Sequence, residues 1–332
     1  MNPGPARVLD SLRRAGGRSC SGEVLSESQG VSRGQVWKDV RTLRARGYTI
    51  EAEPGDGYRL VAVPDRLYPE EIALGLATRW LARDIHYFEE TDSTNRAALD
   101  LARTGAAHGT TVIAEAQTAG RGRLGRTFFS PPGTNLYTSV LLRPKLTTAE
   151  APAWILASAV AVAETVAEFV ERPDAVEIKW PNDVLIDGRK TCGILMELSA
   201  EATRVAHLVL GIGVNLNVDP QTFPEEFRSA ATSVGAHRSE PVERVSFARR
   251  LYENLEGTLE ICEREGLAGV LPRFETHFRM RGRAIRVRDF DGTLRAGSVA
   301  GIDHDGALLL KTNGGPSERI VAGDVTLEKE SS

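Results

Sequence analysis

The chain has 332 residues, of which 41% are hydrophobic, and a formal net charge of −4 at neutral pH. These values allow two or three folded domains and exclude a protein that is basic throughout. The three cysteines are far apart and form no Cys-x-x-Cys pair, and the six histidines form no His-Glu-x-x-His motif. We therefore expect no disulfide framework, no structural zinc and no metal held by protein ligands alone.

Charge is distributed unevenly along the chain. Residues 1–64 contain ten Lys or Arg against seven Asp or Glu, whereas the remainder carries a net charge of −7. A small basic segment on an acidic body favours nucleic-acid binding at the N-terminus. Arg7, Asp10 and Arg13 interrupt the apolar stretch that a secretion signal requires, so a cytoplasmic location is expected.

Residues 1–64 are predicted to form a winged helix-turn-helix DNA-binding domain. Apolar residues recur at helical spacing over 6–15, and Ser21 can cap a short second helix over 23–28. The segment Ser32–Gln35 has the form of a capping box, and the helix that it opens continues with apolar residues spaced for one buried face. Two strand-like runs then flank a turn at 54–57, which is typical of a hairpin wing.

The third predicted helix carries the candidate DNA contacts. Its polar side chains suit phosphates and base edges. The candidates are Ser32, Arg33, Gln35, Lys38, Arg41 and Arg44. The alternative is a solvated helix on a winged helix that binds protein.

Residues 65–279 are predicted to form an α+β domain with a mixed sheet, because the strand-like runs are clustered rather than alternating strictly with helices. The predicted helices cover 69–83, 94–103, 148–170, 241–265 and 267–278. The predicted strands cover 85–89, 111–116, 135–142, 176–180, 183–186, 192–198 and 204–216. The apolar window 151–170 includes Pro152, Glu164 and Glu168, which favours a buried helix over a membrane span. In residues 280–332, short runs separated by Asp-Gly and Gly-Gly turns predict a small β-barrel.

Residues 120–126 read Gly-Arg-Gly-Arg-Leu-Gly-Arg and contain a literal Gly-x-Gly-x-x-Gly. A dinucleotide fingerprint requires a helix after the loop, but the run Pro131–Gly133 would stop one. No Gly-Lys-Ser/Thr is present either, which excludes a P-loop. The remaining interpretation is an arginine loop that binds phosphate or carboxylate. A flexible surface loop and an Arg-Gly-rich nucleic-acid tail are the alternatives.

Lysine is rare in this chain, which has six lysines against 35 arginines. Two of the six, Lys179 and Lys190, lie near the bend Trp180–Asp183. This placement suggests a need for a compact point charge at the end of a sheet, although chance and a Trp-Pro packing corner are alternatives. Asp92–Asn95 and Gly211–Asn215 are two further polar clusters, whose ordinary roles would be a helix cap and a β-bulge.

Taken together, these motifs resemble those of biotin protein ligases. The resemblance rests on Thr91–Asn95, Gln117–Arg126, Lys179–Asp183, Gly188–Leu195 and Gly211–Asn215, in the family's order and spacing. With the winged helix, the whole chain is similar to the bifunctional ligase that also represses biotin-synthesis genes. The resemblance implies a class II synthetase-like catalytic domain and an SH3-like C-terminal barrel. It also implies that biotin and MgATP form biotinyl-5′-adenylate, and that biotin then passes to a lysine of a biotin carboxyl carrier protein.

The resemblance also implies roles for individual residues. Arg121, Lys190 and Asp183 are the implied catalytic residues, with Asp183 meeting the carrier lysine. The implied biotin contacts are Ser93, Thr94, Asn95, Gln117, Gly120, Arg121, Gly122, Arg123 and Lys190. The implied ATP and adenylate contacts are Arg123, Arg126, Phe128, Lys179, Asn182 and Asn215. Phe128 stands where the best-known relatives have tryptophan.

Two other functions remain open at this point. A lipoate protein ligase resembles this fold and chemistry but normally lacks the arginine loop and the winged helix. A transcription regulator could sense biotin without ligating it, although the complete Arg and Lys set argues against lost catalysis. The repressor type further implies a ligand-promoted homodimer on operator DNA.

Overall fold

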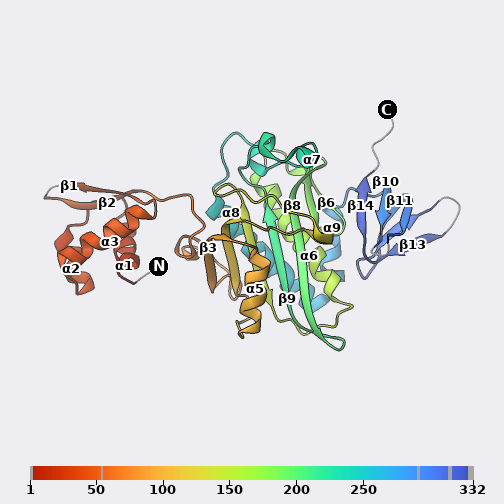
Figure 1. Cartoon of the computed structure of the whole chain (residues 1–332), viewed down its shortest axis with the longest axis horizontal. Helices are drawn as coiled ribbons and strands as arrows, with labels where there is room; N and C mark the ends of the chain where they lie inside the picture. The colour runs from red at the N-terminus through yellow and green to blue at the C-terminus, as the bar shows by residue number, and fades with distance from the viewer. Residues whose placement is uncertain (1–2, 54, 290–291, 313–315, 328–332) are drawn as a thin grey trace. The chain divides into compact units, whose positions relative to one another are not determined.

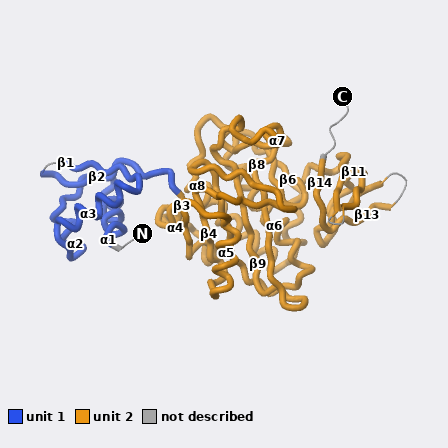
Figure 2. The backbone as a smooth tube through the Cα atoms, viewed as in Figure 1, with its two compact units in different colours: residues 1–66 blue, residues 67–332 orange. Residues whose placement is uncertain are grey.

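The computed structural model describes residues 3–53, 55–289, 292–312 and 316–327. The chain divides into two compact units, residues 1–66 and residues 67–332 (Figure 2). We describe each unit by itself.

The first unit is a winged helix-turn-helix, as predicted. It contains α1 (Pro3–Arg14), α2 (Gly22–Gln29), α3 (Arg33–Ala45) and the antiparallel hairpin of β1 (Thr49–Glu53) and β2 (Gly57–Ala62). Ser21 and Ser32 cap α2 and α3 by accepting hydrogen bonds from the N–H groups of Val24 and Gln35. Gly57 is required where it stands, because a Cβ there would lie 2.1 Å from the carbonyl oxygen of Cys20.

A seven-stranded mixed sheet organises the second unit (Figure 1). Its strand order is β3-β4-β5-β9-β8-β7-β6, in which β3 and β4 are parallel and the other pairs are antiparallel. The strands are β3 (Ile85–Thr91), β4 (Thr111–Gln117), β5 (Leu136–Leu142), β6 (Val176–Lys179), β7 (Asp183–Ile186), β8 (Arg189–Glu201) and β9 (Arg204–Val214). The mixed sheet predicted from the clustered runs is therefore confirmed.

Helices cover both faces of this sheet. Side chains of successive strand residues point to opposite sides, so one strand can contribute apolar residues to the core on both faces. On β5, Val140 and Leu142 belong to the core under α6 (Ala151–Phe169), α8 (Arg244–Glu265) and α9 (Leu267–His277). The intervening Leu141 belongs to a smaller core under α5 (Thr94–Arg103). Helix α6 is long and apolar enough to cross a membrane by length and composition, but 61% of its most apolar window is buried inside the protein.

The helix predicted over 69–83 is wrong beyond its first turn. Helix α4 covers only Pro69–Ala73, and Gly75 adopts a left-handed backbone conformation. The backbone N–H groups of residues 79, 80 and 81 donate to the carboxylate of Glu256 on α8 instead of to helical carbonyls. An acceptor far away in the sequence therefore overrides the local helical pattern. The residues around 69–83 give no sign of this acceptor.

The C-terminal part is a five-stranded antiparallel sheet with the order β13-β12-β11-β10-β14. Its strands are β10 (Ala284–Arg288), β11 (Leu294–Ile302), β12 (Leu308–Lys311), β13 (Ser317–Ile320) and β14 (Asp324–Leu327). The sequence patterns missed β14, which pairs with β10. Buried residues such as Ile285 and Leu308 join the same hydrophobic core as α6 and α9.

A fully buried ion pair links α8 to the sheet. Arg244 on α8 donates to the carboxylate of Glu115 on β4 at 2.9 Å, and both side chains are almost completely buried. Glu115 also accepts from the backbone N–H of Leu67, and Arg244 also donates to the carbonyl oxygen of Asn135. The pair therefore holds the start of the second unit against the strands that carry the site.

Replacing Arg244 by alanine should lower the free energy of unfolding of the second unit by about 3–5 kcal/mol, because it leaves the Glu115 carboxylate buried without its partner. Arg250→Ala on the same helix is the control. Arg250 pairs with Glu168 at 2.6 Å, but both side chains are about 40% exposed, so the loss should stay below about 1 kcal/mol. Urea unfolding followed by circular dichroism measures both. Equal losses in the two variants would contradict this account.

Candidate active site

The β6–β7 hairpin places charged groups at the end of the seven-stranded sheet, as predicted. Lys179 at the end of β6 is paired in register with Asp183 at the start of β7. Between them the Trp180–Pro181 peptide is cis, and the buried Trp180 indole donates to the carbonyl oxygen of Gly306 at 2.9 Å. The tryptophan is thus a packing anchor, and the polar residues beside it are left facing a cavity.

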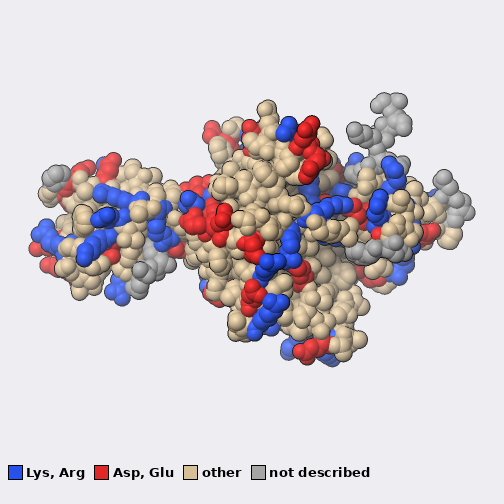
Figure 3. All heavy atoms as spheres, viewed as in Figure 1, with Lys and Arg blue, Asp and Glu red and all other residues tan. Residues whose placement is uncertain are grey.

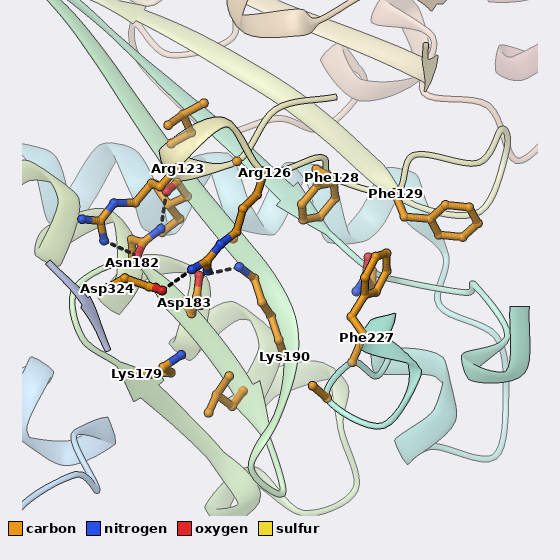
Figure 4. Close-up of a pocket in the computed structure, with 18 of the residues that line it drawn as sticks. Arg123, Arg126, Phe128, Phe129, Lys179, Asn182, Asp183, Lys190, Phe227 and Asp324 are labelled. Carbon is orange, nitrogen blue, oxygen red and sulfur yellow. Dashed lines mark hydrogen bonds and ion pairs between the residues drawn. The ribbon is translucent and has the colours of Figure 1, made fainter. Parts of the chain in front are cut away.

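That cavity has a volume of about 420 Å³. Figure 4 shows Arg123 and Arg126 entering it from the loop, and Lys179 and Lys190 entering from the sheet. Of the residues predicted from the sequence, those that line it are Arg121, Gly122, Arg123, Arg126, Phe128, Lys179, Asn182, Asp183, Lys190 and Asn215. Loop and hairpin, about sixty residues apart in the sequence, therefore form one site.

Among the described residues, each cation of the cavity except Lys179 has an acceptor from another element. Lys190 forms an ion pair with Asp183 at 2.6 Å, and Arg126 pairs with Asp324 on β14. Arg121 donates to the carboxylate of Glu197 on β8 at 3.1 Å. Arg123 donates to Asn182 Oδ1 and to the carbonyl oxygen of Gly323, both at 3.1 Å. Carboxylates and carbonyls therefore offset the repulsion among the cations.

Burial lowers the pKa of Lys179 from its ordinary value, and the neighbouring Asp183 acts in the opposite direction. Burial likewise lowers the pKa of Arg123, against the attraction of Asp183 and Asp324. A buried cation is less favourable than a solvated one unless negative charge is close. An anionic ligand in the cavity would therefore stabilise the charged forms of both side chains.

The arginine loop is a tight turn rather than the start of a helix. Arg121 and Thr127 form an antiparallel bridge, and the N–H of Gly122 donates to the carbonyl oxygen of Arg126 at 2.7 Å. The 3-10 turn η1 (Arg123–Gly125) contains left-handed residues at Leu124 and Gly125. The geometry agrees with rejecting the dinucleotide fingerprint, since no α-helix follows the loop within residues 127–135.

A second, polar recess adjoins the cavity and has a volume of about 30 Å³. It is lined by the predicted residues Ser93, Thr94, Asn95 and Gln117, and it shares Arg121 and Phe128 with the larger cavity. Gly122, Arg123 and Lys190, also predicted to contact biotin, line only the larger cavity. Gly120 lines neither. It is buried where a Cβ would lie 2.6 Å from the carbonyl oxygen of Phe128.

The polar groups of the recess bind one another. Gln117 Oε1 accepts from the N–H of Thr94 at 2.9 Å, and Gln117 Nε2 donates to Ser130 at 3.1 Å. Ser139 donates to Asn95 Oδ1 at 2.6 Å, while Asn95 Nδ2 donates to Glu197 at 2.8 Å. Ser93 precedes α5 but makes no side-chain cap hydrogen bond. The recess thus holds donors and acceptors that a polar ligand head group could take over.

Glycines form the floor under these side chains. Gly193 on β8 pairs with Gly213 on β9, and Gly211 lies two residues along β9. A Cβ on Gly193 would lie 3.0 Å from Lys190 Nζ, and one on Gly213 would lie 2.7 Å from the Phe128 ring. A Cβ on Gly211 would lie 2.0 Å from Asn95 Oδ1. A β-bulge or tight corner would be the ordinary role of Gly211–Asn215, but Gly211–Val214 pair in regular register within β9 and leave room above the sheet.

The two asparagines of the cavity differ in their hydrogen bonding. Asn182 is satisfied, because it accepts from Arg123 and donates to the carbonyl oxygen of Ile194 at 2.7 Å. Asn215 donates to the carbonyl oxygen of Thr232 at 3.1 Å, but its buried Oδ1 has no partner among the described residues. A buried acceptor without a donor is unfavourable, so Asn215 is suited to accept from a ligand.

Several residues in or next to the two cavities were missed from the sequence. Asp324 and Glu197 hold arginines of the loop from β14 and β8, and Ser139 on β5 donates to Asn95 of the recess. Phe129, Phe223 and Phe227 add an apolar wall to the larger cavity (Figure 4). Only long-range folding brings these residues to the site, and no local motif marks them.

The candidate DNA contacts on α3 fall into two groups. Arg33, Lys38 and Arg41 are exposed, and Ser32 caps the helix. Gln35 donates to the buried Asp39 at 3.0 Å, and Arg44 donates twice to the carbonyl oxygen of Ile50. Gln35 and Arg44 thus each make an internal hydrogen bond, and both side chains remain exposed.

Comparisons with known proteins agree with this geometry. The model described as "Biotin/lipoate A/B protein ligase family" matches residues 87–215, the model "HTH domain" matches 6–59, and the model "Biotin protein ligase C terminal domain" matches 282–327. The "Bifunctional ligase/repressor BirA" of Bacillus subtilis strain 168 is 36% identical over 320 residues, which cover 96% of this chain and 97% of that protein. The protein of the same name from Escherichia coli K12 is 35% identical, covering 94% of each chain.

The chain belongs to the biotin protein ligase family. Its match to the bifunctional relatives extends through the first unit, so it is a biotin protein ligase with an N-terminal helix-turn-helix domain. Among solved structures, the biotin protein ligase from Aquifex aeolicus in complex with biotin and ATP gives a TM-score of 0.64 at 26% identity. That likeness covers 75% of this chain and 100% of the other.

For this biotin protein ligase, Gly211→Ala should raise the KM for biotin by about tenfold, because the new methyl group displaces Asn95 from Ser139 and Glu197. Biotin-dependent pyrophosphate release at saturating ATP measures the change. Gly257→Ala on α8 is the control, since a Cβ there meets open space and should leave KM unchanged. An unchanged KM in Gly211→Ala would show that Asn95 does not contact biotin.

Proposed function

We propose that this ligase joins biotin and ATP to form biotinyl-5′-adenylate and pyrophosphate, and then transfers the biotinyl group to a lysine of a biotin carboxyl carrier protein. The observation that supports the proposal is a polar recess opening beside a cation-lined cavity, with Arg121 and Phe128 shared between them. In this proposal the ureido ring of biotin occupies the recess, and its carboxylate extends toward the cations. Ser93, Thr94, Asn95 and Gln117 would meet the two N–H donors and the carbonyl acceptor of that ring.

In the first step a biotin carboxylate oxygen attacks the α-phosphorus of ATP, and the bond from that phosphorus to the pyrophosphate oxygen breaks. Two anions must approach each other, so the protein contributes position and positive charge rather than a nucleophile. We assign Arg121 and Lys190 to the carboxylate and α-phosphate. Arg123, Arg126 and Lys179 are assigned to the remaining phosphates. Anionic ligands would replace the internal carboxylates that now hold Arg121, Arg126 and Lys190.

The nucleoside of ATP is assigned to the wall formed by Phe128 and the two asparagines. Phe128 presents an aromatic ring beside the cavity, as base stacking requires. The Oδ1 of Asn215, which has no hydrogen-bond partner in the part of the chain that the structure describes, can accept from an amine or hydroxyl of the nucleoside. Asp183 and Asp324 are both paired with cations, so we propose that Mg²⁺ enters with the ATP phosphates rather than on a protein cage.

In the second step the carrier lysine attacks the acyl carbon of the adenylate, and AMP leaves with the electrons of the acyl–phosphate bond. The attacking amine must be neutral and must lose a proton as the amide forms. Asp183 is the carboxylate that we assign to receive and orient this amine, because it faces the cavity beside Lys190. The Lys190 cation would stabilise the departing phosphate.

The first unit makes a second role possible. We propose residues 1–64 as the DNA-binding domain, 65–279 as the catalytic domain and 280–332 as a C-terminal domain that contributes Asp324 to the site. By similarity to bifunctional ligase/repressor proteins, the adenylate-loaded chain would dimerise and bind operator DNA in the cytoplasm. A gel shift with the biotin-operon promoter, with and without biotin and ATP, tests this regulatory role.

One assay separates the ligase from its alternatives. The protein is incubated with ATP, a carrier domain, and either labelled biotin or labelled lipoate. Label on the carrier from biotin alone supports the proposal, and label from lipoate alone would identify a lipoate ligase. Adenylate binding without transfer to any carrier would indicate a regulator that has lost catalysis.

Lys190→Ala should reduce biotin-dependent pyrophosphate release by about two to three orders of magnitude, because it removes positive charge where charge develops. Lys145→Ala is the matched control, since Lys145 is exposed and lies outside both cavities. Lys190→Arg, which keeps the charge but changes its shape, tests whether a compact cation is needed. Near wild-type release from Lys190→Ala would remove this residue from the mechanism.

A further inference from the structure

Helix α3 carries a tryptophan on its solvent-facing side. The Trp37 side chain is 51% exposed, whereas Trp154 and Trp180 are 3% and 2% exposed. The opposite side of the same helix buries Val36, Val40 and Leu43 in the core of the unit. About half of Trp37 is therefore left exposed by folding, and a large exposed apolar surface commonly marks a contact site.

Basic residues surround this ring. Arg33, Trp37 and Arg41 are spaced four residues apart and form one row along the helix, with Lys38 beside Trp37. The guanidinium of Arg41 lies over the Trp37 ring, 5.6 Å from its centroid, and this cation–π contact limits the motion of both side chains. Figure 3 shows Lys and Arg side chains gathered on the visible face of this unit. The row thus combines a flat apolar surface with fixed positive charge.

The neighbouring polar groups are partly engaged or acidic. Gln35 and Arg44 are exposed, but each also donates an internal hydrogen bond. On the wing, Arg59 pairs with Glu51 at 2.5 Å and with Glu53 at 3.4 Å. With Asp56 at its turn, the hairpin 49–62 is net negative, so it is poorly suited to phosphate. Charge complementarity for an anionic polymer therefore lies on the α3 row.

We propose that Trp37 is a base-reading residue that packs against the C5-methyl group of a thymine in the major groove of duplex DNA, while Arg33, Lys38 and Arg41 contact the flanking phosphates. A recognition helix enters the major groove, where the thymine methyl is the apolar feature that distinguishes base pairs. The positive rim favours DNA over a protein surface as the partner. The inference rests on the proposed DNA binding and specifies how sequence is read.

The test uses the full chain with biotin and ATP, and a duplex selected by that protein from a random-sequence library. Each thymine of the selected site is replaced in turn by deoxyuridine, which lacks only the methyl group. Wild-type affinity, measured by fluorescence anisotropy, should fall by about three- to fivefold at one or two positions, as expected for one lost methyl contact. Trp37→Ala should bind the thymine duplex more weakly and show no further loss with deoxyuridine.

Two comparisons separate the base contact proposed for Trp37 from the phosphate contacts proposed for the basic residues. Arg33→Ala should lower the slope of log affinity against log salt by about one while keeping the deoxyuridine effect. Trp37→Ala should keep the salt slope of the wild type. Unchanged circular dichroism and unchanged biotin transfer to the carrier would show that the Trp37→Ala chain is folded.

The outcomes distinguish this inference from the proposed function. If the wild-type chain selects no duplex, DNA binding itself fails, and Trp37 is then better explained as a protein contact. If the wild-type chain selects a duplex but deoxyuridine weakens Trp37→Ala as much as wild type, DNA binding stands and the base-reading role is overturned. The base-reading role is also overturned if deoxyuridine weakens wild-type binding at no thymine of the selected site.

Discussion

Repulsion among five cations around one cavity is the constraint on which the catalytic unit depends. Arg121, Arg123 and Arg126 come from one loop, whereas Lys179 and Lys190 come from the ends of two strands, β6 and β8, so no one segment could hold the five together. Their acceptors come from still other places, notably Glu197 on β8 and Asp324 on β14. The C-terminal sheet is therefore part of the site, because one of its carboxylates holds a loop arginine.

The same arrangement explains how the site can bind anions without first collapsing. The carboxylates of Glu197 and Asp324 keep Arg121 and Arg126 oriented, and Arg123 is held by the Asn182 amide and the Gly323 carbonyl. Under the proposed function, substrate phosphate or carboxylate groups would take over these donors. The fifth cation, Lys179, lies beside Asp183, and burial lowers the pKa of its amine while the Asp183 carboxylate acts in the opposite direction.

Space above the sheet is the second requirement, and glycine provides it. Lys190, Phe128 and Asn95 lie over Gly193, Gly213 and Gly211, where any side chain would collide with them. These glycines pair across β8 and β9 in regular register, so they do not bend the strands. The flat floor lets one aromatic ring and one lysine approach the backbone closely, and it lets a polar recess and a charged cavity share a wall.

Local patterns in the sequence determined the winged helix, the capped helices α2 and α3, the mixed sheet and the two motifs that meet at the cavity. Each of these depends on neighbouring residues, whose periodicity and turn chemistry are visible in the chain itself. Tertiary structure alone decided what depends on distant partners. Glu256 accepts from the backbone where the predicted 69–83 helix is broken, β14 brings Asp324 to Arg126, and Gln35 and Arg44 donate hydrogen bonds to Asp39 and to the carbonyl oxygen of Ile50. Hydrogen-bond partners far apart in sequence leave no local signal, so only the folded chain reveals which polar side chains remain available to a ligand.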